Sequence, residues 1–100
     1  MGSSVYRVQV RFTGTFKSRQ GPNEISLEYQ SAPTLREVIE GALRFLQEQG
    51  RGVDEQYVVA ALDSVVISRK AWETTTVRDG QGCALFPPLQ GGSDIKANIS

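Results

Sequence analysis

The spacing of apolar residues changes after the first two alternating segments of this chain, from every second residue to every third or fourth. In residues 5–13 every second side chain is apolar, and residues 24–30 alternate in the same way. A period of two predicts half-buried strands. The Gly21-Pro22 pair lies between the two segments and predicts the turn of a hairpin.

The segment after this hairpin has helical spacing. One stripe of apolar side chains is formed by Leu35, Val38, Ile39, Ala42, Leu43 and Leu46. Thr34 and Glu37 have the spacing of a capping box, and Gly50 can supply the left-handed residue that follows a helix. The segment therefore predicts one amphipathic helix, with its charged residues on a solvated face.

Three further strands are predicted after the helix, at residues 56–62, 65–68 and 83–86. The intervening segment, residues 69–82, reads as a loop. Its Trp72 is interpreted either as a lid over the sheet edge or as part of a contact surface. The order of strand, strand, helix, strand, strand, strand predicts a mixed α+β domain with one helix packed on a small sheet.

Size and charge limit what such a domain does. The chain has 100 residues and 39% hydrophobic content, which suits one compact domain. Eleven basic and eleven acidic residues cancel, so no broad positive field favours nucleic acid as a partner. No apolar run approaches the ~20 residues of a membrane span, and no signal peptide is recognised. We expect a cytoplasmic protein without nucleic-acid or membrane partners.

The residues of common catalytic sites are missing. The chain has no histidine, and Cys83 is its one cysteine, so neither a triad nor a zinc site is predicted. Cys83 lies in an apolar segment and is expected to be buried and inert. The "DGQG" at residues 79–82 lacks a following helix that would hold phosphate, so a tight turn is favoured. The chain is therefore expected not to be an enzyme, and no bound cofactor is predicted.

The segment after Phe86 is the remaining candidate for function. Pro87 and Pro88 restrict the backbone, and Gly91-Gly92 has no side chains, so this stretch could enter a narrow channel in a partner. The competing interpretation is a frayed terminus, because Gly-Gly alone is common.

Two segments favour the functional interpretation because they resemble a known family. The stretches "VAALDSVVIS" at residues 59–68 and "DGQGCALFPPLQGG" at residues 79–92 are similar to those of ubiquitin-like sulfur carriers. The Phe-Pro-Pro followed by Gly-Gly most resembles the small subunit of molybdopterin synthase, the MoaD branch. The resemblance covers about residues 5–92. It implies a β-grasp fold, with a mixed sheet of four to five strands packed on one main helix.

The resemblance also implies a function. In the family, a partner adenylating enzyme of the ubiquitin-activating type uses ATP to activate the terminal glycine carboxylate, here that of Gly92. Sulfur transfer then gives a thiocarboxylate, and the tail inserts into the large subunit of molybdopterin synthase to donate that sulfur. Gly91, Pro87, Pro88 and Leu89 would be the residues of the inserted tail.

The resemblance places the adenylating enzyme's interface at Phe86 and Val66. In this sequence Gly92 is followed by Ser93 and so has no free carboxylate. We therefore expect residues 93–100 to be an extension that a processing protease removes. The full division is a flexible N-terminus at residues 1–4, a β-grasp domain at 5–86, a functional tail at 87–92 and the extension.

Other functions remain open at this point. The chain could carry sulfur for another route, such as thiamine, cysteine, a secondary metabolite or tRNA thiolation. It could also be a ubiquitin-like protein modifier attached through Gly92. An interaction module of the same fold, with an inert tail, is the alternative from a different class.

Overall fold

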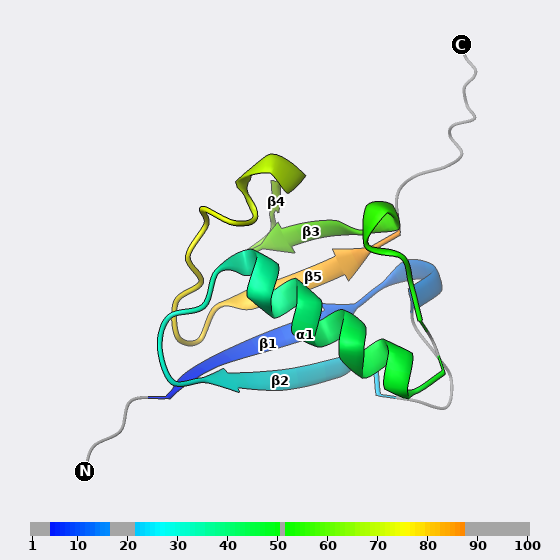
Figure 1. Ribbon diagram of the computed structural model, residues 1–100, viewed down its shortest axis with the longest axis horizontal. Helices are drawn as coiled ribbons and strands as arrows, with labels where there is room; N and C mark the ends of the chain where they lie inside the picture. The colour runs from blue at the N-terminus through cyan, green and yellow to red at the C-terminus, as the bar shows by residue number, and fades with distance from the viewer. Residues whose placement is uncertain (1–4, 17–21, 51, 88–100) are drawn as a thin grey trace.

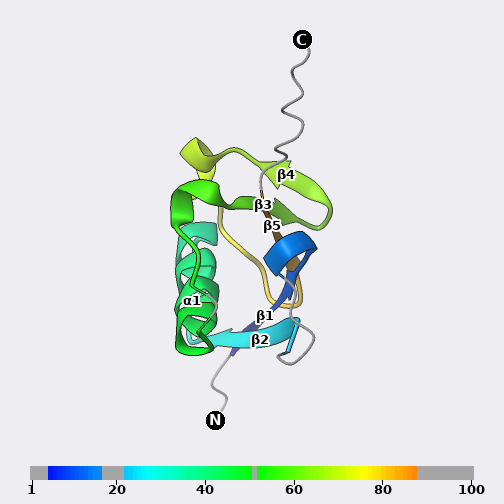
Figure 2. The same cartoon turned by 90° about the vertical axis from the view of Figure 1, so that its right-hand side faces the viewer.

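The computed structural model describes residues 5–16, 22–50 and 52–87, which form one sheet with one helix across one of its faces (Figures 1 and 2). The strands and the helix are β1 (Tyr6–Phe12), β2 (Glu24–Tyr29), α1 (Leu35–Glu48), β3 (Val59–Leu62), β4 (Val65–Ile67) and β5 (Gly82–Phe86). Three single 3₁₀ turns accompany them: η1 (Gly14–Phe16), η2 (Glu55–Tyr57) and η3 (Arg69–Ala71).

The five strands lie in the order β2-β1-β5-β3-β4. The first and last strands of the chain, β1 and β5, are parallel neighbours at the centre, and the other pairs are antiparallel. A five-stranded mixed sheet gripping one helix is the β-grasp arrangement, so the predicted fold class is confirmed. The central position of β5 means that the chain leaves the sheet from its middle.

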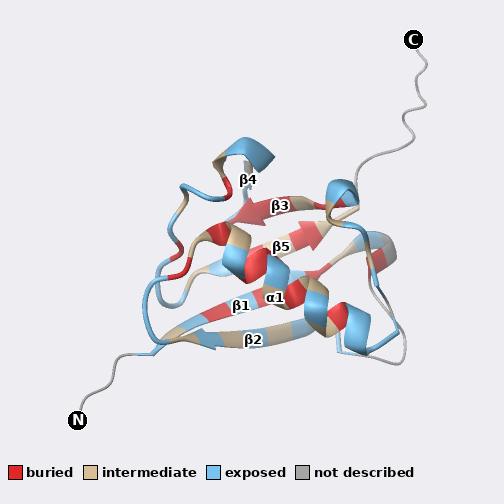
Figure 3. Cartoon of the chain, in the orientation of Figure 1, coloured by how far each residue is buried: buried red, intermediate tan, exposed pale blue. Residues whose placement is uncertain are grey.

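The core lies between α1 and the sheet face that it covers (Figure 3). Alternation along β1 is confirmed, because Val8, Val10 and Phe12 are fully buried while their neighbours point to the other face. The helical stripe is confirmed at five positions, which are buried. Leu43, which was expected on the same stripe in the core, is less buried than predicted. Leu43 is only partly buried and packs at the margin of the core.

Both ends of α1 have the predicted chemistry. The Thr34 hydroxyl accepts from the Glu37 N–H at 3.2 Å, and the Glu37 carboxylate accepts from the Thr34 N–H at 3.0 Å. Thr34 thereby satisfies one of the first-turn amides that have no partner within the helix. Gly50 follows the helix with φ +73, in the left-handed region that glycine tolerates best.

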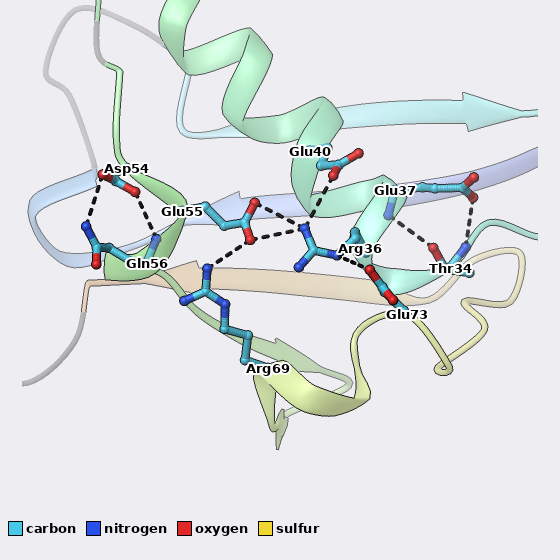
Figure 4. Close-up of polar contacts among 9 residues, drawn as sticks. All are labelled: Thr34, Arg36, Glu37, Glu40, Asp54, Glu55, Gln56, Arg69 and Glu73. Atoms are coloured by element: carbon cyan, nitrogen blue, oxygen red, sulfur yellow. Dashed lines mark hydrogen bonds and ion pairs between the residues drawn. The ribbon is translucent and has the colours of Figure 1, made fainter.

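Two local predictions need correction, and one lies partly outside the described residues. The strand predicted at residues 56–62 begins only at Val59, because the Asp54 carboxylate accepts from the Gln56 N–H and starts the turn η2 (Figure 4). Trp72 is 1% exposed and belongs to the core rather than to a lid or a contact surface. Gly21 of the predicted turn lies outside the described residues.

Candidate functional site

The candidate site is the face of the sheet opposite the helix, together with the point where the chain leaves β5. The predicted interface residues Val66 and Phe86, and the first tail residue Pro87, are all described. The other predicted tail residues, Pro88, Leu89, Gly91 and Gly92, lie outside the described residues, as does the extension at 93–100.

Strand register brings Val66 and Phe86 to the same surface. Val66 pairs with Ala61, which pairs with Ala84 of β5, so these three side chains form a row on the face opposite the helix. Phe86 lies two residues beyond Ala84 and therefore points to the same face. Val66 and Phe86 both line an open groove of about 530 Å³ across this face.

The groove has a small apolar floor and a polar rim. Ala61 and Ala84 keep the floor flat because their side chains end at Cβ, while Val66 is 63% exposed at the side. Arg11 and Asp63 are among the polar residues at the rim. An apolar centre with charged edges is the arrangement of protein-docking surfaces, and it offers no enclosed space for a small molecule.

The tail root, residues 85–87, is held by the segment that follows β1. The Leu85 carbonyl accepts from both the Thr13 N–H at 3.0 Å and the Thr13 hydroxyl at 3.1 Å. The neighbouring Gly14 lies directly against the Pro87 ring. Sequence reasoning did not identify Thr13 or Gly14 as tail contacts. The glycine in "FTGTF" was the available signal, but its meaning depends on the parallel pairing of β1 with β5.

Cys83 does not contribute chemistry to the groove. It lies in β5, and its side chain is 2% exposed within the core cluster. Burial raises the pKa of the Cys83 thiol to about 12, because the low-polarity surroundings disfavour the thiolate. The predicted burial is confirmed, and the thiol is protonated near neutral pH.

The tight turn predicted for "DGQG" is also present, and its polar groups are engaged within the protein. The Asp79 carboxylate accepts from the Arg7 N–H at 2.8 Å, and the Gly80 N–H donates to the Arg7 carbonyl at 2.8 Å. The Gln81 side chain donates to the Asp63 carboxylate at 2.8 Å. The turn therefore ties β5 to β1 and to the β3–β4 hairpin.

Asp63 occupies a strained position in that hairpin. Asp63 and Ser64 have φ values of +50 and +73, in the region that side chains with a Cβ adopt at a cost. The Asp63 carboxylate also accepts from the Gly82 N–H at 3.2 Å. Hydrogen bonding from Gln81, and then from Gly82, holds the pKa of the Asp63 carboxyl below its usual value.

A charged cluster joins Arg36 of α1, Glu55 of η2 and Arg69 of η3 (Figure 4). Glu55 accepts from Arg69 at 2.9 Å and from Arg36 at 3.0 Å, and both guanidinium groups lie within 6 Å of the Trp72 ring centroid, at 5.6 and 5.7 Å. The hydrogen bond from Arg69 is the main cause that lowers the pKa of Glu55. With Glu40 and Glu73 also paired to Arg36, this cluster covers the indole and is structural.

The described part of the chain offers neither a metal-ion site nor a membrane-spanning helix. It holds no group of histidine, cysteine or acidic side chains arranged for a metal ion. Among the same residues, no helix has both the length and the apolar character that a membrane span requires. In the described part of the chain, the groove and the tail root are the features that match the predicted site.

Comparison with solved structures shows the same fold. A Pyrococcus furiosus protein assigned as molybdopterin converting factor subunit 1 superposes with a TM-score of 0.65 at 23% identity, covering 84% of this chain and 99% of that one. A small archaeal modifier protein from Haloferax volcanii gives 0.62 at 13% identity, with 84% and 99% covered. A third match is a chain from a complex of subunits 1 and 2 of the Helicobacter pylori molybdopterin-converting factor. Its TM-score is 0.55 at 24% identity, covering 83% of this chain and 95% of that one.

Sequence comparison identifies the family. No curated protein matches the chain. The model of the ThiS family matches residues 10–92, from the middle of β1 to the second glycine of the Gly-Gly pair. Since this match spans most of the sequence, the chain belongs to the ThiS family.

Proposed function

We propose that the chain is a sulfur carrier whose reactive group is the carboxylate of Gly92. The observation that supports this most is the extent of the family match, which ends at Gly92 rather than at the end of the β-grasp sheet. The tail is thus matched together with the domain. The chain leaves the central strand β5 at Pro87, beside a groove suited to a protein partner.

The chemistry requires activation by a partner. A carboxylate is a poor electrophile, so an adenylating enzyme would join the Gly92 carboxylate to the α-phosphate of ATP and release pyrophosphate. Hydrosulfide, or an equivalent sulfide-level donor, would then attack the acyl carbon. A carbon–sulfur bond forms, AMP leaves with the bonding electrons, and the sulfur loses its proton. The product is a thiocarboxylate at Gly92.

The groove is proposed as the docking surface for the adenylating enzyme. Val66 is mostly exposed beside the groove, and Phe86 belongs to the tail root, so a partner contacting both would lie next to Pro87. The tail residues Pro87, Pro88, Leu89 and Gly91 would then enter the partner's active site. Glycine at residue 91 would allow passage where a side chain would not fit.

Molybdopterin synthesis is the pathway that we favour. The Phe-Pro-Pro motif at residues 86–88 supports it, together with fold neighbours described as molybdopterin converting factor subunits. A neighbour from Helicobacter pylori was solved as a complex of subunits 1 and 2, so a large subunit is the proposed second partner here. Another sulfur pathway would use the same Gly92 chemistry.

An intact-mass experiment tests the carrier chemistry. The chain ending at Gly92 is incubated with the adenylating enzyme of the same organism, ATP and sulfide, and we expect one oxygen to be replaced by one sulfur. The full-length chain is the matched control and should stay unchanged. The adenylating enzyme must be shown to be active on a carrier that it is known to charge. If the mass of the shortened chain then stays unaltered, the proposal is contradicted. Attachment to lysines of other proteins would instead support the modifier function.

Removal of residues 93–100 is a separate part of the proposal. Gly92 is joined to Ser93 by an amide bond, so it can be activated only after that bond is hydrolysed. Incubation of the full-length chain in extract of the source cells should produce the species ending at Gly92. Persistence of the full-length mass alone would show that the extension is not processed.

A further inference from the structure

Gly14 differs from the other described left-handed glycines in what lies beside it. It has φ +61, and a Cβ built there would lie 2.9 Å from Cδ and 3.0 Å from Cγ of Pro87. Gly50 and Gly80 also have positive φ, but no atom lies within 4 Å of a Cβ at either position. Only Gly14 among these three combines the left-handed backbone with a close approach to the tail root.

The contact is rigid on both sides. Cδ of Pro87 is bonded to the backbone nitrogen, so moving the ring moves the main chain. Gly14 cannot retreat freely, because Thr13 is bound to the Leu85 carbonyl through its N–H and its hydroxyl. On the other side, Phe16 is buried at 8% exposure and holds η1 against the core.

We propose that Gly14 is a positioning residue for the tail: the space left by its missing side chain seats the Pro87 ring and thereby sets the direction in which the chain leaves β5. This inference rests on the proposed function, since the direction of exit matters for delivering Gly92 into a partner's active site. Gly14 acts through Pro87 and does not touch the reacting atoms.

The test separates positioning from docking. In the chain ending at Gly92, which retains every contact described for residues 5–87, Gly14→Ala should lower kcat for adenylation by about 10- to 100-fold, because small misplacements of reacting groups are costly. KM for the carrier should stay unchanged, since the groove is intact. Gly50→Ala is the matched control for the strain of a positive φ and should leave both constants unchanged.

Coupling to Pro87 provides the decisive comparison. Pro87→Ala removes Cγ and Cδ, the two atoms that a Cβ at residue 14 would meet. Adding Gly14→Ala to this background should therefore lower kcat much less than it does when Pro87 is present. An equal loss in both backgrounds, or equal kcat values for Gly14→Ala and Gly50→Ala, would overturn the inference.

A structural readout keeps the inference testable without a partner. In the full-length chain, Gly14→Ala should shift the NMR signals of Leu85, Phe86 and Pro87, while Gly50→Ala should not. Gly14→Asn serves if the alanine variant does not fold, because asparagine tolerates positive φ yet still carries a Cβ. Unchanged signals would overturn the inference. A parent chain that is not adenylated would instead count against the proposed function.

Discussion

The two faces of this sheet are built from alternate residues of the same strands, yet they differ in side-chain size and in exposure. The face toward α1 carries large side chains such as Val10, Phe12 and Leu85, and each of these is fully buried. The opposite face carries Ala61 and Ala84 at its centre and leaves Val66 mostly exposed. A period of two thus divides each strand between a face that stabilises the domain and a face that remains open to a partner.

Substitutions on the two faces should therefore have different effects. Loss of a large side chain from the buried face removes apolar contacts and leaves a cavity, so it lowers the free energy of unfolding. Changes on the open face remove few contacts within the domain, so their main effect is expected on binding. Single substitutions can test this division between a stabilising face and an open one.

Trp72 should show the largest effect. Its ring is fully buried, its Nε1–H donates to the Ile67 carbonyl at 3.1 Å, and two guanidinium groups lie over it. Trp72→Ala should lower the free energy of unfolding by about 3–5 kcal/mol. Chemical denaturation monitored by circular dichroism measures this, and a loss below about 1 kcal/mol would contradict the assignment of Trp72 to the core.

Leu46 and Leu43 form a matched pair on the same helix. Leu46 is fully buried, whereas Leu43 is partly buried at the margin of the core. Leu46→Ala should cost about 2–5 kcal/mol, and Leu43→Ala should cost clearly less. The two midpoints of urea unfolding provide the comparison. Equal losses would mean that the helix face is not oriented as described.

Ser64 tests strain on the open side of the molecule. Its φ of +73 is unfavourable for a residue with a Cβ, and its side chain is exposed. Ser64→Gly should therefore raise the free energy of unfolding by about 1 kcal/mol. Gly80→Ala, at φ +87 with no neighbour near its Cβ, is the reverse change and should lower stability by a similar amount. Thermal unfolding of both variants measures this, and a destabilised Ser64→Gly variant would refute the account of the turn.

Asp63 links the same turn to pH. Its folded pKa is depressed, chiefly by the hydrogen bond from Gln81, so its carboxylate stabilises the fold above the unfolded pKa of about 3.9. That contribution is lost as the pH falls through the folded pKa. Asp63→Asn should therefore have a lower free energy of unfolding than the parent at neutral pH. The difference between the two free energies should become smaller below about pH 4. Urea unfolding at several pH values across this range measures that difference. A difference that does not change with pH would show that ionisation of the Asp63 carboxylate does not stabilise the fold.

Val66 should show the smallest effect on stability. At 63% exposure, Val66→Ala should change the free energy of unfolding by no more than about 0.5 kcal/mol. If the groove is the docking surface, the same variant should raise KM for adenylation of the chain ending at Gly92. Steady-state pyrophosphate release measures this KM. A large loss of stability, or an unchanged KM, would break the proposed division between the two faces.

Most of the fold could be predicted from the sequence because each helix or strand has a local pattern of apolar and capping residues. Alternation identified β1 and β2, and the stripe with its capping box identified α1. The burial of Trp72 could not be predicted, since it depends on Ile67, Arg36 and Arg69 meeting around one ring in three dimensions. The central pairing of β1 with β5 is likewise nonlocal, and no local pattern predicts it.

The candidate site was predictable to a smaller extent. Val66 and Phe86 were identified through the family resemblance, and strand register places both on one groove. Thr13 and Gly14 were missed as tail contacts because their partners, Leu85 and Pro87, are more than seventy residues away in sequence. Local sequence patterns do not predict such contacts. They form because β1 and β5 are parallel neighbours, so the segments that follow the two strands lie side by side.

In the proposed function Gly92, and not the one cysteine, receives the sulfur. The most direct test is to charge the chain ending at Gly92 and then locate the sulfur by fragmentation mass spectrometry. We predict an exchange of one oxygen for one sulfur on the Gly92 peptide and no change at Cys83, which is 2% exposed and has its pKa raised to about 12. Sulfur found added to Cys83, with Gly92 unaltered, would contradict the account.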